Sequence, residues 1–119
     1  MNITVDTYTF GSPAVGNNEF ATFVTSQAPQ LGNNYRMTHV NDPIPQLPPT
    51  WLGYQHTSPE YWLANGTATT TAYNASGVVV CEGIGNSDCN AGTGLIPIEG
   101  EAHNNYLGVI SACQASVAF

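Results

Sequence analysis

The stretch from residue 35 to residue 62 constrains the fold more than any other part of the chain. It begins with YRMTHV, an alternating run that predicts a short strand from Tyr35 to Val40, and this strand ends at Asn41-Asp42. Four prolines then follow within residues 43–49. Each proline fixes φ and removes a backbone donor, so this loop is stiff and not helical. The pattern predicts a carboxylate, Asp42, held at a strand end on a rigid loop.

The composition limits the chain to one modest domain with few charges. Its 119 residues are 42% hydrophobic and 8% charged, and eight acidic residues face one basic residue, Arg36, for a net charge of -7. A core of this size suits one structural unit. We expect neither nucleic acid nor an anionic membrane as a partner, because the chain cannot neutralise phosphates. A neutral ester, sugar or apolar ligand fits the charge better.

The residues before Tyr35 predict a βαβ unit. Residues 3–10 are rich in β-branched and aromatic residues, which predicts a buried strand. Asn17 or Asn18 can cap a helix that ends before Pro29. A strand, a helix and the strand that starts at Tyr35 imply parallel strands and a right-handed crossover. The fold class is therefore α/β.

Weaker patterns cover the rest of the chain. The spacing of Phe20, Phe23 and Val24 predicts that one face of the helix packs on the core. The polar residues after Trp62 predict a surface hairpin approach to residues 78–80. From Asn104 the sequence predicts a final helix, with an apolar face formed by Tyr106, Leu107, Ile110 and Cys113.

Cysteines and glycosylation motifs suggest a secreted protein. Cys81 and Cys89 flank a polar loop and could form a local disulfide, which would stabilise the fold by roughly 2 to 3 kcal/mol. Cys113 is then left without a partner in this chain. Three Asn-x-Ser/Thr sequons, which are candidate glycosylation sites, begin at Asn2, Asn65 and Asn74.

The first residues, MNITVDTYTFGSP, have neither the basic region nor the apolar region of a signal peptide. No apolar run reaches the roughly 18 residues that span a bilayer. A composition typical of secreted proteins, combined with an odd cysteine and no export signal, predicts the C-terminal part of something longer.

The three histidines differ in their expected roles. His39 lies within a strand and reads as a core residue with satisfied hydrogen bonds, whereas His56 lies in a turn-rich loop and is expected to bond to the backbone. His103 follows a glycine-containing loop, so its ring can project from the surface. An acid at a strand end followed by a late histidine is the chain order of the last two members of an α/β-hydrolase triad. There, the histidine removes a proton from the serine and the acid orients the histidine.

The nucleophile that should precede this pair is not found. No Gly-x-Ser-x-Gly motif occurs in the sequence. The nearest match, at residues 85–89, lacks the second glycine and follows the acid, and Ser12 precedes a proline. His39, Asp42 and His56 show no metal-ligand spacing, and no phosphate-binding loop occurs. We therefore expect neither a metal nor a cofactor.

Taken together, several segments resemble the fungal class 3 lipases, and in particular the secreted mono- and diacylglycerol lipases. The resemblance spans nearly the whole chain and rests on YTFGSPAVGN at residues 8–17, YRMTHVNDPIPQLPP at 35–49, GYQHTSPEYW at 53–62, VCEGI at 80–84 with Cys89 and Asn90, and Ala102-His103 with Tyr106 and Cys113. It implies that residues 1–119 are the C-terminal portion of one α/β-hydrolase domain.

The resemblance also implies roles for individual residues. Asp42 would be the triad acid and His103 the triad base, and Ile44 and Leu47 would line the acyl-binding side. The serine, the oxyanion hole and the lid would all precede residue 1. The implied activity is hydrolysis of acylglycerols at a lipid interface, by a secreted parent protein that needs no cofactor. This chain alone would be inactive, and its partner would be the N-terminal half of the same fold.

The resemblance further implies a disulfide between Cys81 and Cys89, and a bond from Cys113 to a cysteine near the N-terminus of the full protein. Two alternatives remain open. A feruloyl esterase would share the fold, the acid, the histidine and the cysteine loop, although SPEYW at residues 58–62 favours the lipase. The chain could also be a non-catalytic remnant or a secreted binding module.

Overall fold

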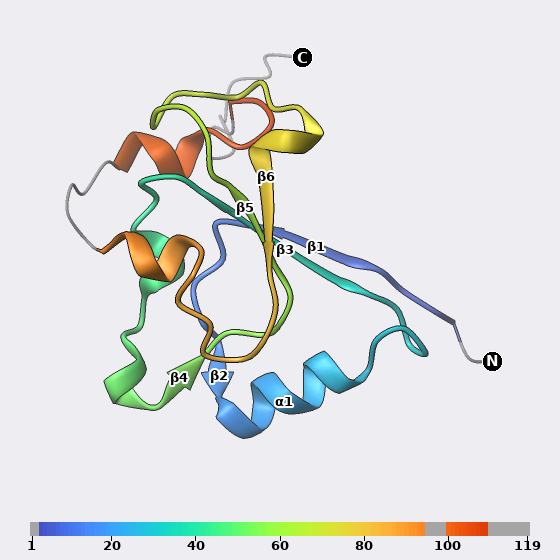
Figure 1. Ribbon diagram of the computed structural model, residues 1–119. Helices are drawn as coiled ribbons and strands as arrows, with labels where there is room; N and C mark the ends of the chain where they lie inside the picture. Colours follow the sequence, from blue (N-terminus) through green and yellow to red (C-terminus); the bar gives the residue numbers. More distant parts are fainter. Residues whose placement is uncertain (1–2, 95–99, 110–119) are drawn as a thin grey trace, which may run out of the picture.

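A four-stranded sheet forms the centre of the computed structural model, which describes residues 3–94 and 100–109 (Figure 1). Its strand order is β1-β3-β5-β6. The first three strands run parallel, and β6 is antiparallel to β5. The strands are β1 (Thr7–Phe10), β3 (Asn34–His39), β5 (Glu60–Leu63) and β6 (Val78–Cys81).

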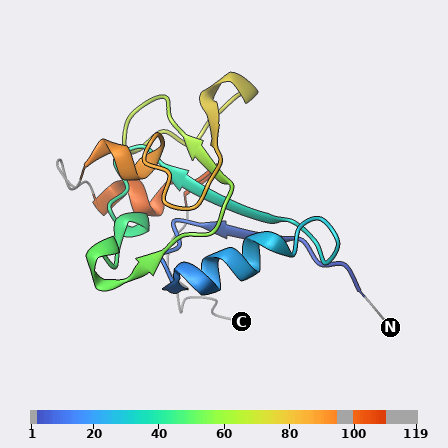
Figure 2. The same cartoon turned by 60° about the horizontal axis from the view of Figure 1, so that its bottom comes forward.

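The predicted βαβ order is confirmed, with parallel β1 and β3 joined through helix α1 (Asn18–Ser26). The Asn17 side chain caps this helix by accepting a hydrogen bond from the Phe20 N–H at 2.9 Å. A second, two-stranded sheet pairs β2 (Gly16–Asn17) with β4 (Tyr54–Gln55) beside α1. Together, α1 and this small sheet lie along one side of the central sheet (Figures 1 and 2).

Five short 3₁₀ helices lie in the loops of the part of the chain that the structure describes. They are η1 (Ile44–Gln46), η2 (Thr50–Leu52), η3 (Ala75–Gly77), η4 (Asn90–Thr93) and η5 (Gly100–Asn104). The proline-rich loop thus contains no α-helix and only two 3₁₀ helices, η1 and η2, as its composition predicts. No helix among the described residues is long and apolar enough to cross a bilayer.

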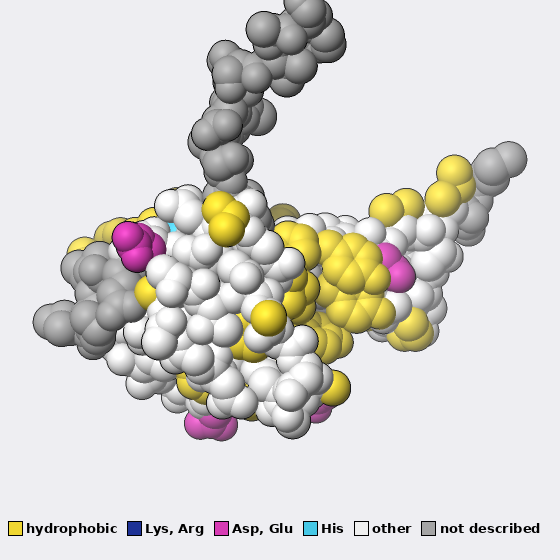
Figure 3. All heavy atoms as spheres, turned by 90° about the horizontal axis from the view of Figure 1, so that it is seen from above, with side chains coloured by type: hydrophobic (Ala, Val, Ile, Leu, Met, Phe, Trp, Pro, Cys, Tyr) yellow, Lys and Arg dark blue, Asp and Glu magenta, His cyan; other side chains and the backbone are white. Residues whose placement is uncertain are grey.

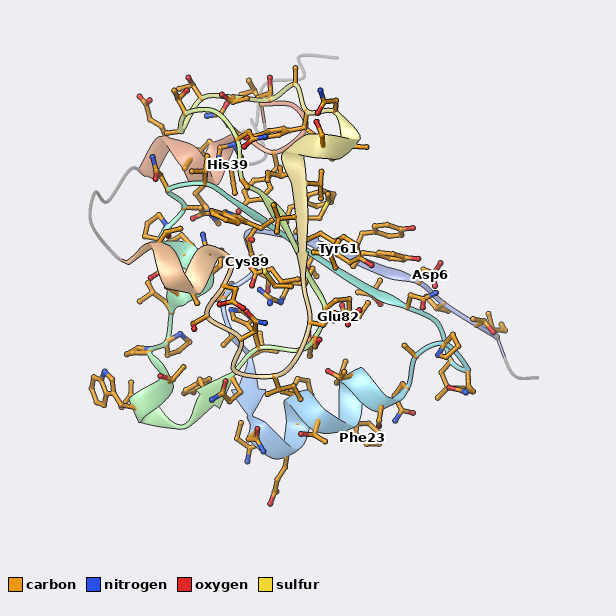
Figure 4. All side chains as sticks on the ribbon, in the orientation of Figure 1. Asp6, Phe23, His39, Tyr61, Glu82 and Cys89 are labelled. Atoms are coloured by element: carbon orange, nitrogen blue, oxygen red, sulfur yellow. A yellow bond between two sulfur atoms is a disulfide. The ribbon has the colours of Figure 1, made fainter. Side chains whose placement is uncertain are left out.

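Two predictions about burial are wrong. The first strand begins at Thr7, and three of its four residues are exposed, because β1 is an end strand of the described sheet. Phe20 and Phe23 do not face the core either, since 43% and 64% of their surfaces are exposed. Helix α1 packs on the small sheet, and Figure 4 shows Phe23 on the lower side of the helix.

One strand was not predicted, and one predicted helix is wrong. Strand β5 has no local signal in the sequence, because its first residue, Glu60, is a buried carboxylate and not an apolar residue. The final helix does not start at Asn104, where η5 ends; Asn105 and Val109 form an isolated β-bridge instead. Leu107 and Gly108 have positive φ values of 43° and 158°, which a right-handed helix cannot accommodate. Ile110 and Cys113 lie outside the described residues.

A buried ion pair ties β3 to β5. The Arg36 Nη2 lies 3.0 Å from Glu60 Oε2, and 8% and 6% of the two side chains are exposed. Burial lowers the pKa of the Arg36 guanidinium, and the adjacent Glu60 carboxylate opposes this shift. Glu60 also accepts hydrogen bonds from the Thr38 hydroxyl and the Asn90 N–H. Both carboxylate oxygens of Glu60 therefore have partners, and these come from two segments, β3 and η4.

We expect the Glu60→Gln substitution to lower the free energy of unfolding by about 3 kcal/mol, because it leaves the buried Arg36 charge without a counter-charge. Urea denaturation measures the loss. Glu82→Gln is the matched control, since Glu82 is exposed, and should change the stability little. Equal effects of the two substitutions would show that the pair does not stabilise the fold.

An aromatic stack lies on the face of the central sheet that is opposite to the Arg36–Glu60 ion pair. Tyr8 stacks on Tyr35 with ring centroids 4.6 Å apart, and Tyr61 follows at 5.5 Å from Tyr35. Figure 4 shows Tyr61 above the strands, and Figure 3 shows hydrophobic side chains gathered on the surface seen from above. Tyr8 is 60% exposed, so the described part of the chain leaves the Tyr8 end of this face uncovered.

Candidate active site

Asp42 and His103 meet although 61 positions separate them in the sequence. Asp42 follows the end of β3 and is 1% exposed. Its Oδ1 accepts a hydrogen bond from the Ile44 N–H at 2.9 Å, and its Oδ2 lies 3.1 Å from His103 Nδ1. The Tyr106 hydroxyl donates a hydrogen bond to the same Oδ2. Each carboxylate oxygen therefore has a defined partner, which fixes the orientation of the acid.

The contact with Asp42 determines how His103 can act. A carboxylate can only accept a hydrogen bond, so the neutral imidazole carries its proton on Nδ1 and leaves the Nε2 lone pair free to accept another. The ring lies in η5 and is 38% exposed, whereas Asp42 is fully buried. A buried acid that orients a partly exposed imidazole is the arrangement that a general base requires.

The backbone of Gly11 packs directly against His103 and Asp42. It follows β1 at φ +63°, and its N–H donates a hydrogen bond to the Met37 carbonyl at 3.0 Å. A Cβ at this position would lie 2.8 Å from His103 Nδ1 and 3.0 Å from Asp42 Oδ2. Only glycine permits both this φ and this close approach. Sequence reasoning missed this role, although a glycine directly after a strand is a signal of such an approach.

Tyr106 is a second residue beside this pair, although its position in the sequence predicts the apolar face of a helix. It is buried, and its ring contacts the rings of Phe10 and His39 edge-on. Burial and the hydrogen bond to Asp42 raise the pKa of its hydroxyl well above the usual range. The hydroxyl therefore remains protonated and continues to donate to Asp42 across the neutral pH range.

We expect Tyr106→Phe to lower the free energy of unfolding by about 2 kcal/mol, because Asp42 loses a hydrogen bond to a charged acceptor. The raised pKa also gives a pH test. Above about pH 10 the unfolded tyrosine ionises while the folded one does not, so Tyr106 makes stability fall as pH rises. The phenylalanine variant should lose this part of the alkaline slope. Urea denaturation at several alkaline pH values measures both effects, and identical slopes would contradict the prediction.

The other two histidines behave as the sequence predicts. His39 is completely buried, with Nδ1 2.7 Å from the Val40 carbonyl and Nε2 2.8 Å from the Thr70 carbonyl. His56 Nε2 lies 2.5 Å from the Pro45 carbonyl, and burial lowers the pKa of this imidazole. Both rings bond to the backbone, so His103 is the histidine available for proton transfer. Within the described ranges, no group of His, Cys, Asp and Glu could hold a metal ion.

The two predicted acyl-binding residues lie beside Asp42 in the sequence. Ile44 begins η1, and Leu47 is 40% exposed directly after η1. A cavity of about 380 Å³ lies beneath this loop, between the prolines and the disulfide loop. None of Asp42, His103, Ile44 and Leu47 lines it. This cavity is therefore separate from the acid and base.

The disulfide between Cys81 and Cys89 is present, and it closes the loop that follows β6. Asn65 and Asn74 are exposed, as a glycosylation site must be. Asn2 and Cys113 lie outside the described residues.

Comparisons with known proteins give a consistent result. Residues 2–51 match the family profile "Lipase (class 3)". The chain is 49% identical over 108 residues to secreted mono- and diacylglycerol lipase 1 of Fusarium solani, covering 91% of this chain and 31% of that protein. It superposes on the crystal structure of the mono- and diacylglycerol lipase of Aspergillus oryzae with a TM-score of 0.77 at 35% identity, covering 87% of this chain and 37% of that one.

In sequence and in fold, this chain is therefore similar to part of the fungal class 3 lipases. A structure from a family of fungal lipases with an unusual buried polar cluster agrees, with a TM-score of 0.78 at 39% identity over 89% of this chain and 37% of that one. The predicted α/β-hydrolase fold is thus confirmed for the part compared. The chain spans about a third of the length of these class 3 lipases.

Proposed function

We propose that this chain supplies Asp42 and His103 to the Ser-His-Asp triad of an enzyme that hydrolyses mono- and diacylglycerols. The observation that carries the proposal is the contact of 3.1 Å between His103 Nδ1 and the buried Asp42 carboxylate. The names of the relatives, secreted mono- and diacylglycerol lipases of Fusarium solani and Penicillium camembertii, support the substrate class. No metal or cofactor takes part in this chemistry.

In this mechanism, His103 Nε2 accepts the proton of a serine hydroxyl as that oxygen attacks the ester carbonyl. The resulting imidazolium is stabilised by Asp42, and it then donates the proton to the departing alkoxide. Water regenerates the serine in a second round of the same steps. The printed sequence contains no Gly-x-Ser-x-Gly motif, so the serine would come from the two thirds of the domain that this chain does not span.

Three further assignments belong to the same proposal. Ile44 and Leu47 would contact the acyl chain, since both follow Asp42 closely on the proline-rich loop. The protein would be secreted, as its relatives are, and would carry glycans on the exposed Asn65 and Asn74. Residues 1–119 would form the C-terminal part of one domain and would pack against its N-terminal part. The substrate would be a neutral ester at a lipid interface.

An exchange protein tests this proposal directly. In it, the 119-residue chain replaces the matching region of the Fusarium solani lipase, which supplies the remaining two thirds. We expect this protein to hydrolyse dioleoylglycerol, and we expect His103→Ala to lower its turnover number by about 10⁴-fold. A folded exchange protein without activity would refute the proposal, and a preference for methyl ferulate would redirect it to the feruloyl esterases.

A further inference from the structure

We infer that Asn90 is a positioning residue for the triad acid, and that the Cys81–Cys89 disulfide anchors Asn90 for this role. The inference rests on the proposed function, because it assigns a task to the site that contains Asp42 and His103. In the sequence, Asn90 is named only as part of the disulfide-loop segment of the resemblance, and its position in a polar loop rich in glycine and asparagine predicts no role for its side chain.

The Asn90 side chain clamps the turn on which Asp42 lies. Its Nδ2 donates one hydrogen bond to the His39 carbonyl and one to the Asp42 carbonyl, each 3.0 Å long. These carbonyls stand at the two ends of the turn that leaves β3, which also closes through the Asp42 N–H and the His39 carbonyl at 3.2 Å. Both amide protons of Asn90 are thereby used on the backbone that carries the acid.

This turn has a conformation that benefits from external support. Asn41, between the clamped residues, has φ 64°, in the left-handed region that non-glycine residues seldom occupy. Such a residue costs conformational energy, and it persists where its surroundings determine it. The two hydrogen bonds from Asn90 help to hold the backbone of this turn in place. Because the Asp42 side chain projects from this backbone, they also help to fix its direction.

Asn90 is itself held from three sides. Its N–H donates to Glu60 Oε1 on β5 at 3.1 Å, and its carbonyl accepts from Gln46 Nε2 of η1 at 3.0 Å. The preceding residue, Cys89, is bonded to Cys81 at the end of β6. Figure 4 shows Cys89 and His39 on different segments. Asn90 connects these segments through its hydrogen bond to the His39 carbonyl. The disulfide thus fixes the start of η4 against the sheet.

The orientation of the amide is also determined. Asn90 is 1% exposed, and within residues 3–94 and 100–109 its Oδ1 has no hydrogen-bond partner. A flipped amide would point this oxygen at two carbonyl oxygens, which repel it. An unpaired buried acceptor costs stability. Stability alone therefore does not explain the choice of asparagine, whereas two donors aimed at the backbone of the acid do.

The test uses the exchange protein and the Asn90→Leu variant, which has a similar volume and no donors. We expect kcat to fall by about 10- to 100-fold with little change in KM, because the acid shifts relative to His103. The far-downfield proton NMR signal of the His103 Nδ1–H should move or disappear in the same variant. Asp88→Ala is the control, since Asp88 is an exposed neighbour in the same loop, and both readouts should stay unchanged. If Asn90→Leu does not fold, Asn90→Ala removes both donors with a smaller side chain.

The outcomes separate the inference from the proposed function. A lower melting temperature with unchanged kcat and an unchanged NMR signal would make Asn90 merely structural and overturn the inference. If the exchange protein without further substitutions lacks esterase activity, the proposed function is refuted. The NMR signal of the His103 Nδ1–H would still decide the role of Asn90. Replacing Cys81 and Cys89 together by serine should change the signal in the same direction, and a variant with unchanged kcat and signal would remove the disulfide from the inference.

Discussion

Asp42→Asn in the exchange protein is expected to lower the turnover number for dioleoylglycerol by about 10⁴-fold. The amide oxygen can still accept the hydrogen bond from the Ile44 N–H. The amide nitrogen then faces His103 and donates to Nδ1, which moves the imidazole proton to Nε2. His103 in that tautomer has no lone pair on Nε2 to accept a proton from the serine. The loss therefore arises from the proton position and not from a change of fold.

Initial rates on dioleoylglycerol, together with a melting curve, check this prediction. Asp88→Asn is the matched control, because it makes the same chemical change at an exposed position. We expect the control to retain the activity of the parent. Activity close to the parent in Asp42→Asn would remove Asp42 from the triad, and loss of the folded state would require the Tyr106 contact to be tested first.

Asp42 and His103 could be proposed as acid and base from the sequence because each has a local signal. Asp42 stands between a strand pattern and a proline-rich loop, and His103 follows a glycine-containing loop. Their contact could be expected only through the chain order of a known triad, since nothing local joins two residues 61 positions apart. The structure brings them together by placing η5 over the ends of β1 and β3.

The residues that support the pair have no such local signal. Tyr106 belongs to a pattern that resembles an amphipathic helix, and the positive φ at Leu107 and Gly108 is what ends that pattern. Asn90 resembles any other polar loop residue until its two long-range hydrogen bonds are known. Strand β5 was missed because the buried Glu60 breaks the apolar pattern of a central strand, and its partner Arg36 is 24 positions away.

Exposure was mispredicted because the sequence encodes surfaces that the described residues do not cover. Tyr8 and Phe23 are apolar residues in regular elements, and each is more than half exposed. The relatives are about three times as long as the chain, and large exposed apolar groups indicate a surface that packs on something else. A pattern of apolar residues predicts burial within a whole domain. Because the chain spans about a third of the length of its relatives, part of that burial is not seen in the described residues.

Gly11→Ala is expected to reduce the turnover number of the exchange protein by at least about 100-fold, because the new Cβ would lie 2.8 Å from His103 Nδ1 and 3.0 Å from Asp42 Oδ2. The Asp42 oxygen cannot retreat freely, since Asp42 is buried and hydrogen-bonded to Ile44 and Tyr106. The imidazole must therefore move, and its contact with the acid lengthens. The left-handed φ of +63° adds a strain of about 1 kcal/mol in the folded state.

Gly53→Ala separates the steric effect from the strain. Gly53 has φ +87°, and a Cβ there would meet nothing within 4 Å. Both substitutions should lower the free energy of unfolding through strain, but only Gly11→Ala should lower turnover and shift the His103 NMR signal. Equal turnover in the two variants would show that the packing of Gly11 against His103 and Asp42 does not limit activity. A large activity loss in Gly11→Ala alone would show that the bare backbone at the end of β1 sets the distance between acid and base.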